Sequence, residues 1–187
     1  MGGPQYFFAG TPAGVPAPPG VLGRAASNPG VRRLTEPEGL QVLTTLEDVR
    51  NACRRALSSA QRLLSIYTLD LEPAIYEQPA FLDLIKRFLL AHSFAKIRVL
   101  TQRPVAYGSS HKLAAMRRRL SGHIDIRTVH AQFAARTSGL LIADDRAIVY
   151  RSQATSFEGV AGFEHQPIAR LYLNEFDEMW VASVPKY

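Results

Sequence analysis

Strand-like and helix-like segments alternate along the middle of the chain, and this alternation restricts its fold more than any other feature. Apolar strand patterns at 65–71, 96–102 and 123–129 are separated by apolar residues at helical spacing in 79–94 and 109–122. A strand pattern at 39–45 and a helix pattern at 46–64 precede them. The order β-α-β-α-β-α-β is typical of a layered α/β domain with a largely parallel sheet.

The helix expected at 46–64 has a recognisable beginning and one buried face. Thr45 supplies a hydroxyl cap, and the acids Glu47 and Asp48 in the first turn favour the positive end of the helix dipole. Cys53 lies on the apolar stripe and is the single cysteine, so it forms no internal disulfide and is best explained as a small buried hydrophobe. This cysteine usage fits a reducing, cytoplasmic location.

The C-terminal part departs from the alternation. The apolar runs 139–145 and 147–153 are separated by a very short turn, so they are expected to pair as an antiparallel hairpin. A glycine-containing loop at 156–165 follows, and Pro167 is expected to start a last amphipathic helix through Trp180. The expected fold is therefore α/β, with a layered mixed sheet that is mostly parallel, carries a C-terminal antiparallel hairpin and is flanked by helices.

Length and composition indicate one domain. The chain has 187 residues, and its Pro/Gly/Ala-rich start predicts a flexible leader at 1–37, followed by a single domain at 38–187. The start lacks the basic and apolar regions of a signal peptide, and no apolar stretch approaches the ~18 residues of a membrane span. These features favour a soluble protein that is not exported.

Positive charge is concentrated in one segment. Residues 96–136 contain nine basic side chains and one acid, a net charge of +8, whereas the remaining 13 basic and 15 acidic residues give −2. This asymmetry favours an anionic partner such as nucleic acid or a phosphorylated molecule. The alternative is a solvated basic face that is balanced by the acidic last helix.

Two places at strand or helix ends are candidate anion sites. Ser110, His111 and Lys112 begin a helix, where free amides and basic side chains can hold a phosphate, unless Ser110 merely caps the helix. Asp70 ends a strand and could meet residues from neighbouring strand ends, because ligands gather at the carboxyl ends of parallel strands. Alternatively, Asp70 caps its own turn and pairs with an arginine. The full candidate anion site comprises Asp70, Arg103, Ser110, His111, Lys112, Arg117, Arg118, Arg127 and Arg151.

The hairpin and the segments before it resemble the phospholipase D-like superfamily. In that superfamily the first hairpin strand carries the pattern H-x-K-x4-D, and the second ends in Gly-Ser or a similar small pair. The segments IYTLDLEPAIYEQPAFLDLIKRF, HKLAAMRRRLSG and LLIADDRAIVYRSQATSFEGVAGF are also similar to a bacterial family of unknown function with this fold. The motif positions fall on Thr137 (His), Gly139 (Lys), Asp144 (Asp), and Arg151 and Ser152 (the small pair).

This resemblance implies a degenerate site, a pseudoenzyme rather than a hydrolase. Phospholipase D chemistry needs imidazoles for attack and protonation and lysines for charge stabilisation, and neither Thr137 nor Gly139 supplies these groups. Asp144 is expected to bond the backbone of its own hairpin turn. Arg151 is expected either to grip a phosphate or to pair with an acid where the site once stood. No cofactor is expected, and the histidine spacing predicts no metal site.

Three functional hypotheses follow. The first is a non-catalytic phospholipase D-like domain that binds an anionic ligand, with nucleic acid as the leading candidate. The second is a protein-interaction or regulatory module, which could form a homodimer through its basic face and acidic last helix. The third is a weak phosphodiesterase that uses His111 and Asp70 in a relocated site.

Overall fold

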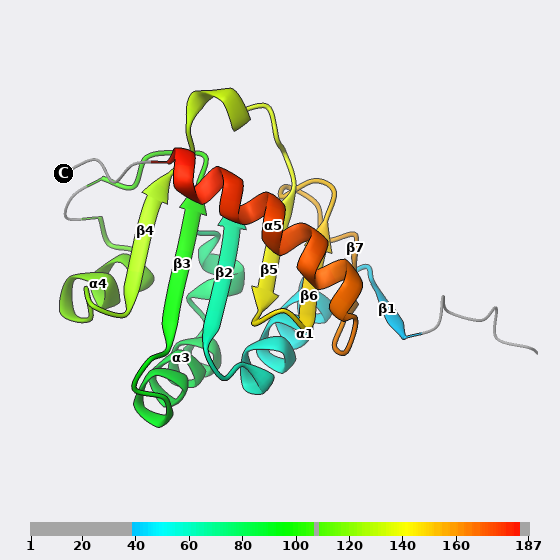
Figure 1. The fold of residues 1–187 in the computed structure, drawn as a ribbon, viewed down its shortest axis with the longest axis horizontal. Helices are drawn as coiled ribbons and strands as arrows, with labels where there is room; N and C mark the ends of the chain where they lie inside the picture. Colours follow the sequence, from blue (N-terminus) through cyan, green and yellow to red (C-terminus); the bar gives the residue numbers. More distant parts are fainter. Residues whose placement is uncertain (1–38, 107–108, 184–187) are drawn as a thin grey trace, which may run out of the picture. The chain divides into compact units, whose positions relative to one another are not determined.

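A computed structural model describes residues 39–106 and 109–183. The expected leader at 1–37 lies outside these ranges. Within them, seven strands form one mixed sheet in the order β1-β7-β6-β5-β2-β3-β4 (Figure 1). The strands are β1 Leu40–Leu43, β2 Leu63–Thr68, β3 Lys96–Thr101, β4 Ile124–Thr128, β5 Gly139–Ala143, β6 Ala147–Arg151 and β7 Gly159–Gly162.

Helices flank both faces of this sheet, which confirms the expected α/β class. In Figure 1, α1, α3 and α4 lie behind the sheet, and α5 crosses its front face diagonally. Within the described residues, no helix has the length and apolar character needed to cross a membrane. The helices are α1 Leu46–Ser59, α2 Pro73–Tyr76, α3 Pro79–Ala91, α4 Lys112–Arg119 and α5 Gln166–Ala182, with a 3₁₀ turn at Ala131–Phe133.

The sheet is less parallel than expected. Only the β2–β3 and β3–β4 pairs are parallel; β5 pairs antiparallel with both β2 and β6, and β7 pairs antiparallel with β6 and β1. A parallel connection needs a long crossover, usually a helix, and the chain between β4 and β5 forms only a 3₁₀ turn. The chain therefore re-enters the sheet in the opposite direction, and the hairpin β5–β6 forms as expected.

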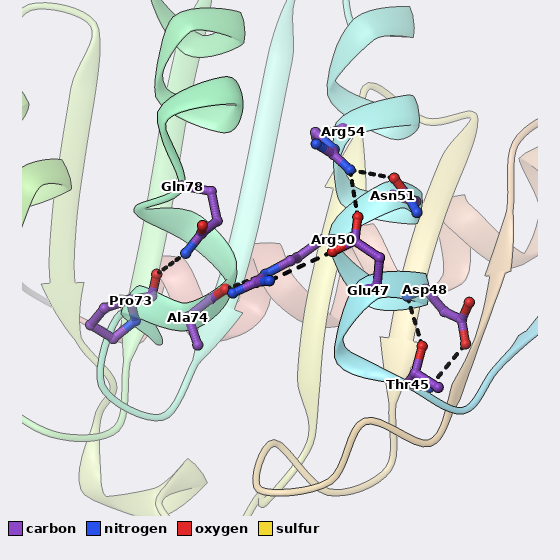
Figure 2. A network of polar contacts seen from close by, with 9 residues as sticks. All are labelled: Thr45, Glu47, Asp48, Arg50, Asn51, Arg54, Pro73, Ala74 and Gln78. Atoms are coloured by element: carbon purple, nitrogen blue, oxygen red, sulfur yellow. Dashed lines mark hydrogen bonds and ion pairs between the residues drawn. The ribbon is translucent and has the colours of Figure 1, made fainter.

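Helix α1 begins as predicted and ends earlier. Thr45 Oγ1 accepts a hydrogen bond from the Asp48 amide (3.1 Å), and the Asp48 carboxylate accepts one from the Thr45 amide (2.9 Å), a complete capping box (Figure 2). The expected extension to residue 64 is wrong, because Leu63 and Leu64 open β2 and pair with β3, and Leu64 also pairs with β5. Sheet pairing outweighs the helical spacing of these leucines.

Strand β7 was expected to be part of a loop. A side chain at Gly159 would collide with the carbonyl oxygen of Tyr150, and one at Gly162 would come within 2.9 Å of Leu40 Cδ2 and His165 Cδ2. The glycines that resemble loop residues in the sequence are therefore what allows β7 to pack closely between β6 and β1. The last helix starts one residue before Pro167 and extends slightly beyond Trp180.

Two apolar clusters hold the layers together. One lies between the sheet and α1, α3 and α4 and includes Cys53, which is fully buried as expected. The other lies under α5, where Phe176 and Met179 pack on Tyr67 and Leu100. Both faces of β5 and of the carboxyl-terminal halves of β2 and β3 are thus covered, which accounts for the continuous apolar sequence of β5.

Candidate functional site

The carboxyl edge of the parallel strands is where the phospholipase D-like motif would lie. Strands β2, β3 and β4 end there, while β5 begins and β6 ends there. Gly139 pairs directly with Arg151 across the hairpin, and Thr137 Oγ1 lies 3.5 Å from the carbonyl oxygen of Ser152. The structure therefore brings four of the five motif positions together, whereas Asp144 lies at the far end of β5.

A buried ion pair fills this edge. Arg151 is 2% exposed, and its Nη2 donates to Glu72 Oε1 at 2.7 Å. Its Nη1 donates to the carbonyl oxygens of Ala154 (2.7 Å) and Ser156 (3.0 Å). The other carboxylate oxygen of Glu72 accepts a hydrogen bond from Thr68 Oγ1 at 2.5 Å. Of the two expectations for Arg151, pairing with an acid is the one that the structure confirms.

The same guanidinium occupies the space in front of Gly139. A Cβ atom at this position would lie 2.6 Å from Arg151 Nη2 and 3.0 Å from its Cζ. Position 139 is where the resemblance places the phosphate-binding lysine. No side chain fits there while Arg151 keeps its present conformation.

Glu72 reaches Arg151 from a strained segment. Leu71 and Glu72 have φ values of 70° and 31°, in the left-handed region that non-glycine residues rarely adopt. The Asp70 carboxylate accepts a hydrogen bond from the Glu72 amide (3.3 Å), and the Glu72 carbonyl accepts from the amides of Ile75 and Tyr76. Such strain costs about 1–3 kcal/mol per residue, so the surrounding contacts must favour this conformation strongly.

The ionisable groups buried around the pair are poor nucleophiles. Burial raises the pKa of Cys53 to about 12 and raises the pKa of Tyr76 well above its ordinary value. Burial alone would lower the pKa of Arg151, but Tyr76 and Glu72 outweigh it and hold the pKa above its ordinary value. At neutral pH, Cys53 and Tyr76 are protonated and Arg151 is charged.

Residues at the neighbouring strand ends, which were candidates for a shared ligand site, bind partners within the described part of the chain. Asp70 pairs with Arg103 at 3.3 Å and also caps its own turn, as the structural alternative predicted. The hydroxyl of Tyr67 donates to the Arg136 carbonyl (2.9 Å) and accepts from Gln102 Nε2 (3.0 Å). Each of these polar groups is thus engaged inside the fold.

The start of α4 differs from the predicted anion site. The residue at the N-cap position is His111, whose side chain makes no capping bond, so the expected cap by Ser110 is wrong. His111 Nδ1 instead lies 3.1 Å from Glu77 Oε1, a carboxylate that no local sequence signal connects to it. Lys112 is exposed at the first helical position.

The remaining candidate arginines divide into engaged and exposed residues. Arg127 donates to Asp125 (3.0 Å) and to the carbonyl oxygens of Trp180 and Ser183, and its guanidinium lies 3.9 Å from the centre of the Trp180 ring. Arg117 reaches Asp125 at a longer distance, 3.9 Å. Arg118 is exposed.

Asp144 has a different partner from the one expected. It does not bond its own turn; its carboxylate accepts hydrogen bonds from the amides of Gln61 (2.9 Å), Arg62 (2.9 Å) and Leu63 (2.8 Å). Three charge-assisted bonds tie the hairpin to the start of β2, more than 80 residues away in sequence. The neighbouring Asp145 pairs with Arg170 at 2.8 Å.

A separate hollow lies between α1 and the start of α3. Glu47 accepts a hydrogen bond from Arg54 at 2.9 Å and lies 3.6 Å from Arg50, which also donates to the Ala74 carbonyl (Figure 2). One carboxylate is therefore shared by two arginines, and both guanidinium groups are already bound. Among residues 39–106 and 109–183, no three His, Cys, Asp or Glu side chains are grouped as a metal site would require.

Comparisons with known proteins support the fold and define a family match. The model of a family described as a domain of unknown function (DUF7931) matches residues 45–187. No protein with curated annotation matches the chain. Among solved structures, the chain is similar to Nuc from Salmonella typhimurium, a phospholipase D family member, with TM-score 0.53 and 17% identity over 79% of this chain and 97% of that one.

Two further structures extend this likeness. NucT from Helicobacter pylori is similar with TM-score 0.52 and 15% identity, over 79% of this chain and 97% of that one. TrmBL2, an archaeal chromatin protein whose structure shows a novel mode of DNA binding, is similar with TM-score 0.57 and 13% identity. That match covers 79% of this chain, which spans about half (53%) of the archaeal protein. At these identities the likeness shows a phospholipase D-like fold.

Proposed function

The chain belongs to the DUF7931 family, and from this premise we propose that it is a non-catalytic member of the phospholipase D-like superfamily that binds an anionic ligand, with nucleic acid as the leading candidate. The observation that carries the loss of catalysis is the guanidinium of Arg151 in front of Gly139. The charge of this guanidinium is neutralised by Glu72. Arg151 therefore fills the space of the missing lysine side chain, but its charge is not available to a phosphate. The histidine position holds Thr137, which is no base at neutral pH.

Charge pairing supports an anionic ligand. Of the nine basic residues in 96–136, five lie within 4.0 Å of a carboxylate, so the fold uses about half of this charge internally. The other four are exposed and have no carboxylate partner among the described residues: Lys96, Lys112, Arg118 and Arg119. Uncompensated surface cations of this kind attract phosphate-rich ligands. The similar fold of an archaeal protein that binds DNA favours nucleic acid among such ligands.

The alternative of a homodimer held by the acidic last helix loses most of its electrostatic basis. Two of the three carboxylates of α5 are paired within the chain, Glu175 with Arg136 (2.7 Å) and Asp177 with Arg98 (2.7 Å). They are therefore poorly placed to attract the basic face of a second copy. The flexible leader at 1–37 stays a prediction, and the proposed function does not depend on it.

Two assays test the proposal. Fluorescence anisotropy with labelled oligonucleotides at two salt concentrations should detect binding that weakens steeply as salt rises; no binding at either concentration would refute it. Hydrolysis of a chromogenic phosphodiester should stay at the level of a protein-free blank. Turnover that disappears in His111→Ala would instead support a weak enzyme with a relocated site.

A further inference from the structure

Helix α5 leaves part of one sheet face uncovered. Because it crosses the sheet diagonally, the first residues of β2, β3 and β4 lie below it in Figure 1 without a covering helix among the described residues. The side chains on this face change accordingly along β3: Leu100 lies in the apolar cluster under α5, whereas Arg98, two residues earlier, pairs with Asp177 of α5 and donates to Ser65. The rim of α5 on this side is therefore polar.

Two adjoining hollows follow this open face. One, of about 390 Å³, is lined by Lys96, Arg98, Trp180 and the turn before β4; the other, of about 430 Å³, is lined by Arg62, Phe94 and the β5–β6 turn. Both are lined by Leu63 and Lys96, so the two hollows adjoin. We call the two together the amino-edge groove and define it by Arg62, Leu63, Phe94, Lys96, Arg98 and Trp180.

The carboxylates along the groove are bound within the fold. Asp145 pairs with Arg170, Asp125 with Arg127 and Asp177 with Arg98, whereas Asp144 accepts hydrogen bonds from three backbone amides and has no cationic partner among the described residues. The exposed Arg62 and Lys96 likewise have no carboxylate partner among the described residues, although the Lys96 amine donates to the Gly122 carbonyl. Two unpaired cations against one unpaired carboxylate leave the groove with a net positive charge.

The basic end of α4 adds to this charge. Arg117 reaches Asp125, a residue of the groove lining, at 3.9 Å, so its guanidinium lies beside the groove. Asp125 already pairs with Arg127 at 3.0 Å, so Arg117 adds a positive charge there. An extended anionic chain leaving the groove at the β4 side would meet it.

An exposed aromatic ring lines the same hollow as the two cations. Phe94 is 88% exposed, next to Ala95 and Lys96 in the turn that leads into β3, and lines this hollow together with Arg62. A flat apolar group that covered this ring in the bound state would add the stabilisation of burial. Cations beside an open aromatic ring are the combination that binds single-stranded nucleic acid, through phosphates and stacked bases respectively.

We infer that the amino-edge groove binds single-stranded nucleic acid, with phosphates at Arg62 and Lys96 and a base stacked on Phe94. This inference rests on the proposed binding of nucleic acid and places it at the edge of the sheet opposite the degenerate motif. A duplex keeps its base faces stacked inside, so it can use the two cations but not the ring. The groove should therefore prefer single strands.

The test compares the groove with a distant part of the same protein. The full chain is titrated into a labelled single strand of about 20 thymidines and into a labelled duplex of similar length. The groove variant is Arg62→Ala/Lys96→Ala, and its matched control is Arg55→Ala/Arg87→Ala, which removes the same charge from exposed positions on α1 and α3. Phe94→Ala removes the ring without changing charge.

The groove variant should reduce the magnitude of the slope of log K against log salt by about 1.4, since each phosphate contact to a single strand contributes about 0.7. Phe94→Ala should weaken single-strand binding by roughly fivefold or more and leave duplex binding unchanged. The control variant should retain binding. Circular dichroism should show native folding in all three, because every substituted side chain is exposed.

The outcomes separate this inference from the proposed function. If the wild type binds neither oligonucleotide at low salt, both are overturned. If the wild type binds and the groove variant keeps its affinity and its salt slope, nucleic acid binds elsewhere on the chain and the groove is refuted while the proposed function stands. Equal losses in the two charge variants, together with an unaffected Phe94→Ala, would likewise refute the groove, because they would indicate attraction by net charge alone.

Discussion

Replacement of Glu72 by glutamine should destabilise the fold strongly, because it leaves the buried Arg151 guanidinium without a counter-ion. The two side chains are 11% and 2% exposed, so water cannot replace the lost carboxylate. Removing one partner of a buried ion pair costs about 3–5 kcal/mol, and the bonds to the Ala154 and Ser156 carbonyls keep the guanidinium in place. For a chain of this length the loss corresponds to a fall in Tm of roughly 6–20 °C.

Thermal and urea denaturation, followed by circular dichroism, measure this change. The matched control is Asp83→Asn, which breaks the surface ion pair between Asp83 and Lys86. The two side chains are 61% and 58% exposed, respectively. That loss should be below about 0.5 kcal/mol. The double variant Glu72→Leu/Arg151→Met removes both charges and should be more stable than the sum of the single losses predicts, because no unpaired charge remains.

Two results would refute the reasoning. A loss in Glu72→Gln that is no larger than in Asp83→Asn would mean that the pair contributes nothing beyond a surface contact. Additive losses in the double variant would mean that the two charges are not coupled. In either case, Arg151 would be held by its carbonyl partners and not by Glu72.

Two substitutions and one labelling experiment test the contacts of Gly139, Asp144 and Cys53. Gly139→Ala should cost about 1–3 kcal/mol in urea denaturation, because its Cβ would meet Arg151; wild-type stability would show that the guanidinium is free to move away. Asp144→Ala should cost about 1–3 kcal/mol through three unpaired amides, and a smaller loss than in Asp145→Ala would contradict this. Cys53, with a pKa of about 12, should stay protonated and resist a thiol reagent at pH 8 until urea unfolds the chain; rapid labelling of the native protein would disprove its burial.

The expected elements were largely correct where the signals are local. Capping at Thr45 and the start of α3 at Pro79 depend on residues within one turn, and both are present. The prediction was wrong in two places, the extension of the helix to Leu64 and the loop in place of strand β7. In both places the local residue pattern disagrees with the pairing of strands in the sheet. A leucine or a glycine carries little information about its partner strand, so pairing across the sheet decided both.

The candidate site shows the same difference between features set by local sequence and features set by distant partners. The absence of imidazole and lysine is fixed by the residue types at Thr137 and Gly139, so the loss of the motif was visible without a structure. The partner of Arg151 was not, because Glu72 lies 79 residues away and no periodicity connects the two. Arg151 was expected among the anion-binding residues, and its burial removes it from that group.

The sequence by itself thus determined the alternation of strands and helices, the hairpin, and the loss of the phospholipase D-like chemical groups. These properties depend on residue type and on spacing within one turn or one pair of strands. Only the tertiary structure decided the antiparallel insertion of β5 beside β2, the pairing of Arg151 with Glu72, the backbone partners of Asp144, and which cations remain exposed at the amino edge. Charges find their partners in space and not along the chain, so the accessible charge of a surface is known only once the fold has paired the rest.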